Sequence, residues 1–209
     1  MIPAGNACFP TVPGMEKPPP VCYTGHRAET PRAAGGVRRR WKRSWRNKGM
    51  ADSSSIEQQT VTWFLESGST LATAESCTGG LIAHLLTNVS GASGFFVGGV
   101  VAYSNRVKET ILGVPPDVLA ANGAVSAETA TAMAEGVRRR LGADYGLAVT
   151  GIAGPGGGTT EKPVGLVYIA AASPDGRTAC REFRFSGTRG AVKKRTAEAA
   201  LDMVLELFT

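Results

Sequence analysis

Three short segments of this sequence hold the side chains that could do chemistry. ESCTGG (75–80) follows an apolar run and supplies a carboxylate, a hydroxyl, a thiol and a second hydroxyl before two glycines. YSNRVK (103–108) places a lysine five residues after a tyrosine, and TGIAGPGGG (150–158) is rich in glycine. These residue types predict a nucleophile, a base for it, and a loop whose backbone N–H groups can hold an anion such as phosphate.

Ser76 is the first candidate nucleophile. The pattern predicts a strand that ends at this serine and a helix that follows it, which is the geometry of a nucleophile elbow, although the flanking Gly-x-Ser-x-Gly is absent. Cys77 is a rival, but adjacent side chains at a strand end point in opposite directions, so only one of the two can face a substrate. The alternative, which the local sequence favours, is that Ser76 or Thr78 only caps the helix.

A serine nucleophile needs a base, and histidine is scarce. The chain has two, His26 and His84, which argues against a Ser-His-Asp triad and against a zinc site. The remaining candidate bases are Lys108, Tyr103 and Glu75. A lysine base must be neutral, and lowering its pKa from about 10.4 to about 7–8 by burial corresponds to roughly 3–4 kcal/mol. The alternative is an ordinary surface lysine.

The glycine-rich loop (151–158) fits neither common phosphate motif. It lacks the lysine of a P-loop and the spacing of a dinucleotide fingerprint. Consecutive glycines still expose N–H groups to an anion, while a flexible surface loop is the alternative.

Hydrophobic periodicity and turn residues predict the elements that position these segments. Helices are expected over 56–67, 78–87, 105–112, 127–141 and from 188 onward, and strands over 70–74, 95–104, 145–150, 164–173 and 178–186. Residues 115–125 read as a loop with one turn at most. Alternating strands and helices predict an α/β fold with a mostly parallel, mixed sheet of about five strands, covered on both faces, with one antiparallel hairpin. The polar segments then lie at the carboxyl ends of strands.

The net charge of +6 is unevenly distributed. Residues 1–49 hold 10 Lys+Arg and 2 Asp+Glu, a net of +8, and the remaining 13 basic and 15 acidic residues give −2 for 50–209. We expect 1–49 to be a disordered basic tail, either a gene start annotated too early, with Met50 as the true start, or an arm that binds nucleic acid. No apolar run reaches membrane-span length, and four cysteines without CxxC spacing indicate reduced thiols in a cytoplasmic protein.

Five ordered motifs carry a family resemblance. They are TAESCTGGLIA, VAYSNRVKETILGV, GAVSAETATAMAEGV, VTGIAGPGGGTTEKPVGLVYIA and FSGTRGAVKKRT. Residues 53–208 resemble the CinA C-terminal domain family, whose stand-alone members are nicotinamide-nucleotide amidohydrolases. The resemblance implies a three-layer α/β/α sandwich over 50–209 and hydrolysis of nicotinamide mononucleotide to nicotinate mononucleotide and ammonia. It implies Ser76 as nucleophile, Lys108 as base and Tyr103 as an orienting or relaying group.

The resulting hypothesis assigns the remaining residues of the site. Backbone N–H groups of Cys77, Thr78 and Gly79 would hold the oxyanion. Arg189 or Lys193 would bind the nucleotide phosphate. The further substrate-binding candidates are Glu75, Asn105, Thr150, Gly151, Gly154 and Gly157. No metal or cofactor is expected, the partner is a small nucleotide, and the family suggests a homo-oligomer.

Three alternatives stay open at this point. A CinA-type domain could act as a protein-binding module in competence or the damage response without catalysis. The basic arm could bind nucleic acid. The enzyme could also prefer another amide, because nothing in the sequence reads out pyridine or ribose directly.

Overall fold

The computed structural model describes residues 54–208, so the predictions about the tail (1–49) and about Met50 lie outside the described residues. The elements follow in this order: α2 (Ile56–Ser67), β1 (Leu71–Glu75), α3 (Leu81–Thr87), the 3-10 helix η1 (Ala92–Gly94), β2 (Phe96–Val101), α4 (Asn105–Thr110), α5 (Pro116–Asn122), α6 (Ala127–Leu141), β3 (Tyr145–Gly151), β4 (Leu166–Ala172), β5 (Thr178–Arg184) and α7 (Arg189–Phe208). None of the helices in this part of the chain combines the length and the apolar character that crossing a bilayer requires.

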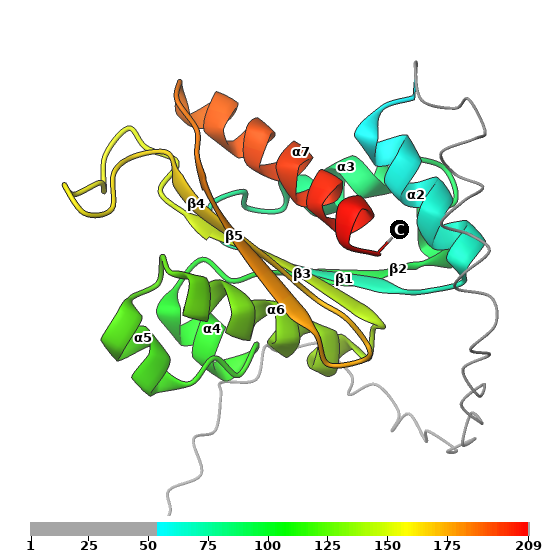
Figure 1. Ribbon diagram of the computed structural model, residues 1–209, viewed down its shortest axis with the longest axis horizontal. Helices are drawn as coiled ribbons and strands as arrows, with labels where there is room; N and C mark the ends of the chain where they lie inside the picture. Colours follow the sequence, from blue (N-terminus) through cyan, green and yellow to red (C-terminus); the bar gives the residue numbers. More distant parts are fainter. Residues whose placement is uncertain (1–53, 209) are drawn as a thin grey trace, which may run out of the picture. The chain divides into compact units, whose positions relative to one another are not determined.

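The five strands form one mixed sheet in the order β2-β1-β3-β4-β5. β1 runs parallel to both β2 and β3, whereas β4 is antiparallel to β3 and β5. Helices α2, α3 and α7 cover one face of the sheet, and α4, α5 and α6 cover the other (Figure 1). The predicted three-layer α/β/α sandwich with a mixed five-stranded sheet is therefore confirmed.

Each face of the sheet has its own hydrophobic core. Leu147 and Val149 of β3 pack with α2, α3 and α7, while Ala148 between them packs with α6. This alternation follows from the two-residue period of a strand. β1 is buried along its whole length because it lies inside the sheet and is covered on both faces, which explains why its sequence is apolar without alternation.

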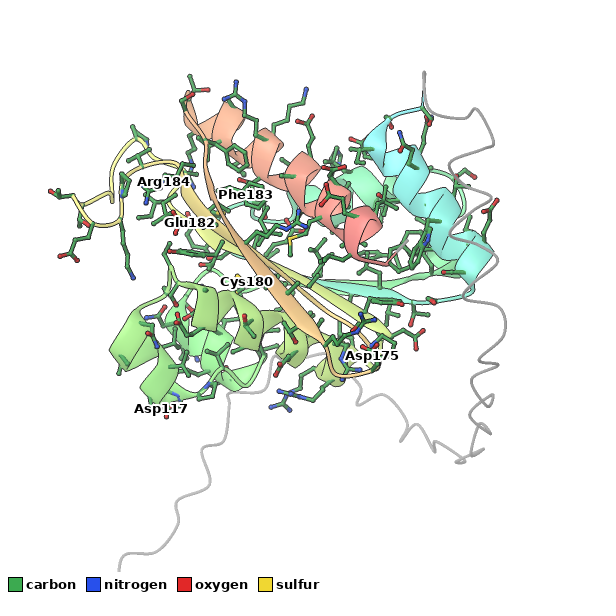
Figure 2. The ribbon with its side chains drawn as sticks, viewed as in Figure 1. Asp117, Asp175, Cys180, Glu182, Phe183 and Arg184 are labelled. Atoms are coloured by element: carbon green, nitrogen blue, oxygen red, sulfur yellow. The ribbon has the colours of Figure 1, made fainter. Side chains whose placement is uncertain are left out.

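β5 forms one edge of the sheet and shows how its side chains divide between the two faces. Figure 2 shows Cys180, Glu182, Phe183 and Arg184 along this strand. Phe183 packs on the core beneath α7, and Cys180 packs on the core beneath α6. Glu182 and Arg184 are exposed and form an ion pair with 2.9 Å between Oε1 and Nε.

The structure differs most from the predicted elements at three places, while the other bounds shift by two residues at most. Residues 116–122 form the helix α5 instead of a loop, with a proline in its first turn and Leu119 buried. α3 begins at Leu81 instead of Thr78, because Gly79 and Gly80 adopt left-handed φ angles of 63° and 98°. β2 ends at Val101, so Tyr103 lies two residues beyond it.

Candidate active site

The sheet topology brings the three polar segments to one edge. Glu75, the last residue of β1, lies opposite Val101 at the end of β2 and opposite Val149 near the end of β3. Because the three strands are parallel neighbours, the segments that follow them leave the sheet on the same side. The sequence separates ESCTGG, YSNRVK and the glycine-rich loop, and the fold places them together.

Ser76 and Lys108 form the central contact of this edge. The Lys108 Nζ donates to Ser76 Oγ at 3.1 Å and to the carbonyl oxygen of Ala102 at 2.7 Å. Ser104 caps α4 by accepting from the Val107 N–H, which places Lys108 one turn into that helix. The contact joins a candidate nucleophile to a candidate base within hydrogen-bonding reach, as general-base catalysis requires.

Lys108 is a buried lysine, with 1% of its surface exposed. Among residues 54–208 no carboxylate forms an ion pair with it. Burial lowers the pKa of Lys108 below its ordinary value of 10.5, because a charged ammonium is poorly solvated there. The alternative reading of Lys108 as a surface lysine is therefore wrong, and burial shifts its pKa in the direction that a base requires.

The structure also rules out a capping role for Ser76. The N-cap of α3 is Gly80, which has no side-chain cap hydrogen bond. The Ser76 N–H donates to Val149 O at 3.0 Å, and the Ser76 hydroxyl accepts from Lys108 instead of capping α3. The Thr78 hydroxyl is buried and has no hydrogen-bond partner among the described residues, so it does not cap the helix either.

Cys77 points away from Ser76, as the strand-end argument predicts. Its side chain is 6% exposed and belongs to the core beneath α7, while Ser76 contacts Lys108 on the α4 side. Burial is the main reason that the pKa of the Cys77 thiol is raised to about 11. A thiol with this pKa stays protonated at neutral pH, and the protonated form is a poor nucleophile.

Glu75 has a different position from the one that the sequence suggests. It is a candidate base and substrate ligand in the sequence, but in the structure it is 1% exposed and both carboxylate oxygens are in use. Oε2 accepts from the N–H groups of Gly80 (2.9 Å) and Ile82 (3.0 Å), and Oε1 accepts from Ala83 (2.9 Å). Glu75 thus fixes the turn from β1 into α3. It does not bind the N–H groups of Cys77, Thr78 and Gly79, of which the first two interact with the Cys77 sulfur.

Tyr103 contacts Arg189 instead of the Ser76–Lys108 pair. The Tyr103 hydroxyl accepts from Arg189 Nη2 at 3.0 Å, and its side chain is 64% exposed. Arg189 Nη1 donates to the carbonyl oxygen of Gly154 at 2.8 Å. Arg189 therefore ties the end of β2 to the glycine-rich loop, and Tyr103 has no direct hydrogen bond to the nucleophile or to its base.

The glycine-rich loop is held by contacts that the sequence does not signal. Thr150 is buried, and its hydroxyl donates to Ala124 O at 2.6 Å, so it is not open to a ligand. Lys162 Nζ donates to the carbonyl oxygens of Asn122 (2.6 Å) and Val125 (2.8 Å), which fastens the loop to the segment before α6.

The four remaining candidates from the sequence take up different positions. Gly151 is the last residue of β3 and pairs with Val167. Gly154 and Gly157 have positive φ angles of 77° and 86°, where glycine is favoured. Asn105, the first residue of α4, is exposed.

Two surface hollows of the described residues lie away from this edge. One of about 420 Å³ is lined by residues around η1, including Val89 and Phe96, and one of about 580 Å³ lies between α2 and α7. Neither is lined by Ser76 or Lys108. Within residues 54–208, no three His, Cys, Asp or Glu side chains gather in a group that could hold a metal ion.

Comparison with known proteins identifies the family. The model of the CinA C-terminal domain matches residues 53–208. The chain belongs to the CinA C-terminal domain family. The matched range contains all three polar segments, so the Ser76–Lys108 contact and the glycine-rich loop lie within the CinA domain.

Relatives of known sequence or structure agree with this assignment. A CinA-like protein of Myxococcus xanthus is 52% identical over 153 residues, which are 73% of this chain and 36% of that protein. The chain therefore spans about a third of the length of the curated relatives it matches. The crystal structure of the competence/damage inducible protein CihA from Agrobacterium tumefaciens matches with a TM-score of 0.72 and 42% identity, covering 74% of this chain and 94% of that one. The crystal structure of a competence-damaged protein (CinA) superfamily protein from Enterobacter cloacae matches with a TM-score of 0.71 and 32% identity, covering 76% of this chain and 95% of that one.

Proposed function

We propose that this protein hydrolyses the carboxamide of nicotinamide mononucleotide to nicotinate mononucleotide and ammonia, with Ser76 as nucleophile and Lys108 as base. The observation that carries the proposal is the 3.1 Å contact between Ser76 Oγ and the Nζ of a lysine that is 1% exposed. A lysine without a role in catalysis would normally extend into solvent and would not contact a serine hydroxyl from a buried position. The resemblance to the family suggests the reaction and its nucleotide substrate, and the contact between Ser76 and Lys108 supports a serine nucleophile with a lysine base.

In the acylation step, Ser76 Oγ attacks the carbonyl carbon of the amide. A neutral Lys108 amine has two N–H groups and one lone pair, so it can donate to Ala102 O and accept the Ser76 proton through the lone pair. The new Oγ–C bond gives a tetrahedral oxyanion. When the C–N bond breaks, Lys108 returns the proton to the nitrogen, which leaves as ammonia.

In the deacylation step, water replaces the amine. Lys108 takes a proton from the water, the hydroxide attacks the Ser76 ester, and the proton returns to Ser76 Oγ as the Oγ–C bond breaks. The products are the carboxylic acid and free enzyme, so atoms and protons balance over the cycle. One lysine serves as base and acid in both halves.

The oxyanion needs hydrogen-bond donors near Ser76. Glu75 binds the N–H groups of Gly80, Ile82 and Ala83 and not those of Cys77 to Gly79, which lie at the turn beside the nucleophile. The N–H groups of Cys77 and Thr78 also interact with the Cys77 sulfur, so we assign the Gly79 N–H to the oxyanion. A single donor of this kind contributes about 100- to 1,000-fold to turnover in serine hydrolases.

The test is to incubate the full chain with nicotinamide mononucleotide and to measure ammonia and nicotinate mononucleotide together. We expect the two products in equal amounts. Lys108→Met, which keeps the length of the side chain and removes the amine, should lower kcat by about 100- to 10,000-fold, the usual contribution of a general base. Arg106→Met is the matched control, because Arg106 is an exposed cation on the same helix.

Two results would count against the proposal. Folded protein that releases no ammonia from nicotinamide mononucleotide would exclude this substrate. Lys108→Met and Arg106→Met variants with equal turnover would exclude Lys108 as the base even if the substrate were right.

A further inference from the structure

Lys193 is the one cation in the first two turns of α7 whose charge has no partner among the described residues. Arg189 donates to Gly154 O and Tyr103 OH, Lys194 pairs with Glu198 at 3.7 Å, and Arg195 donates to Ser186 O at 2.8 Å. Lys193 has no ion pair and no hydrogen bond in residues 54–208, although its side chain is half-buried. An ammonium without a protein partner, on a side chain that is partly covered by the fold, is free to bind an anionic ligand.

The Lys193 ammonium lies against the ESCTGG turn. Its Nζ is 3.7 Å from the point where a Cβ on Gly79 would stand, and Gly79 has a left-handed φ of 63° that favours glycine. The position of Lys193 on α7 is fixed by its neighbours, since Val192 and Thr196 are both fully buried. The helix that carries Lys193 is therefore fixed in place, with the ammonium beside Gly79, which is three residues along the chain from Ser76.

Ser76 and Lys193 approach this turn from opposite sides. Ser76 contacts Lys108 on the α4 side of the sheet, whereas Cys77, Val192 and the rest of the α7 face belong to the opposite core. A ligand that reaches both groups must cross the turn, with its amide at one end and its anion at the other. Nicotinamide mononucleotide has this form, with ribose between the carboxamide ring and the phosphate.

We propose that Lys193 binds the phosphate monoester of the substrate, and that Arg189 positions the glycine-rich loop without binding the phosphate itself. The inference rests on the proposed function and adds a basis for specificity to it. An amide that lacks the anionic end, such as nicotinamide riboside, forgoes the Lys193 contact. The enzyme should therefore select phosphorylated amides through binding and not through the chemical step.

The test measures equilibrium binding by calorimetry, with the full chain carrying Ser76→Ala so that no turnover occurs. Adding Lys193→Gln should raise the Kd for nicotinamide mononucleotide roughly tenfold or more, because a charge-assisted hydrogen bond is lost. The Kd for nicotinamide riboside should stay within about twofold. Lys194→Gln, a neighbour that loses the same charge on the same helix, should change neither, and Lys193→Arg should keep part of the affinity.

A second measurement uses the unsubstituted protein and does not depend on a folded variant. Inorganic phosphate or nicotinamide mononucleotide should protect Lys193, and not Lys194, from acetylation by an N-hydroxysuccinimide ester, as followed by peptide mass spectrometry. Equal labelling of Lys193 with and without either anion would overturn the proposal. An unchanged Kd of the Lys193→Gln variant for the nucleotide would also overturn it. The same holds if the Kd for the nucleotide and the Kd for the riboside rise by the same factor.

The outcomes separate this inference from the proposed function. Hydrolysis of nicotinamide mononucleotide with an unchanged KM in Lys193→Gln would refute the phosphate contact and leave the amidohydrolase intact. Protection of Lys193 by the nucleotide without any ammonia release would support the anion site and refute the reaction.

Discussion

Replacing Glu75 by glutamine should loosen the turn that carries Ser76. The buried carboxylate accepts three backbone N–H groups, and residues 54–208 supply it with no ion-pair partner. Glutamine keeps the shape but puts an NH₂ group where one oxygen stands. The N–H that faces this group, for example that of Ala83, then meets a donor instead of an acceptor.

The expected loss follows from these three hydrogen bonds. A buried N–H left without an acceptor costs about 1–3 kcal/mol, and a bond to a neutral oxygen is about 1 kcal/mol weaker than one to a charged oxygen. One lost hydrogen bond and two weakened ones destabilise the fold, and the neutral amide offsets part of this because no charge has to be buried. The net loss in the free energy of unfolding is about 2–4 kcal/mol. For a domain of this size that lowers Tm by roughly 5–15 °C.

The assay is chemical unfolding of the full chain, followed by far-ultraviolet circular dichroism, together with turnover of nicotinamide mononucleotide. We expect Glu75→Gln to unfold at lower denaturant and to lose at least about tenfold in kcat/KM, because the turn also positions the oxyanion donors. Glu66→Gln is the matched control, since Glu66 is an exposed carboxylate on α2. If both variants unfolded at the same midpoint and turned over alike, the role given to Glu75 would be refuted.

Three further predictions follow from burial and close packing. Because burial lowers the pKa of Lys108 from 10.5, kcat/KM should rise with pH and level off below pH 10.5. The free energy of unfolding should also rise with pH between the lowered pKa and 10.5, because in that range the unfolded chain binds a proton that the folded protein does not. A plateau reached only above pH 10.5 would contradict this account of the base. Cys77→Ala should keep most of the activity and lose about 1 kcal/mol in the free energy of unfolding. Alkylation at pH 8 should not inactivate the protein, because the buried thiol stays protonated. A loss of turnover as large as that of Ser76→Ala would make the thiol the nucleophile. Gly136→Ala should destabilise the protein by more than about 2 kcal/mol, because the added Cβ would stand 2.1 Å from Leu112 O. Gly190→Ala is the control, and it should be neutral or stabilising because its Cβ would meet open space. Equal midpoints for the two variants on denaturant unfolding would refute the packing argument.

Local sequence patterns were sufficient to predict the five strands and the mixed sheet, although not the order of the strands or the antiparallel pairing of β3 with β4. β1 and β3 are short apolar runs between turn signals, and the Asp-Gly between β4 and β5 indicates a hairpin, so the mixed sheet follows from these segments. α5 escapes the same reasoning. Its Pro-Pro start and Asn-Gly end are typical of a loop, whereas the structure shows a helix with a proline in its first turn and Leu119 buried in the core beneath α6.

The site divides in the same way. The contact between Ser76 and Lys108 is predictable, because parallel strands bring their carboxyl ends together and the spacing places a lysine one turn into the next helix. The partners supplied by the backbone are not predictable from side-chain types. Lys108 needs the carbonyl of Ala102, and Glu75 needs N–H groups on a helix that begins six residues later. Lys162 likewise binds two carbonyl groups that lie far from it in the sequence.

The most direct test of the account is the rate of ammonia release from nicotinamide mononucleotide by the full chain and by its Ser76→Ala variant. Ser90→Ala, which removes an exposed serine hydroxyl from the loop before η1, is the control. We predict release by the parent and by Ser90→Ala, and a loss of at least about 1,000-fold in Ser76→Ala, because the Ser76 hydroxyl forms the acyl intermediate. Release by folded Ser76→Ala at the parent rate would contradict a serine mechanism and, with it, the function proposed for the Ser76–Lys108 pair.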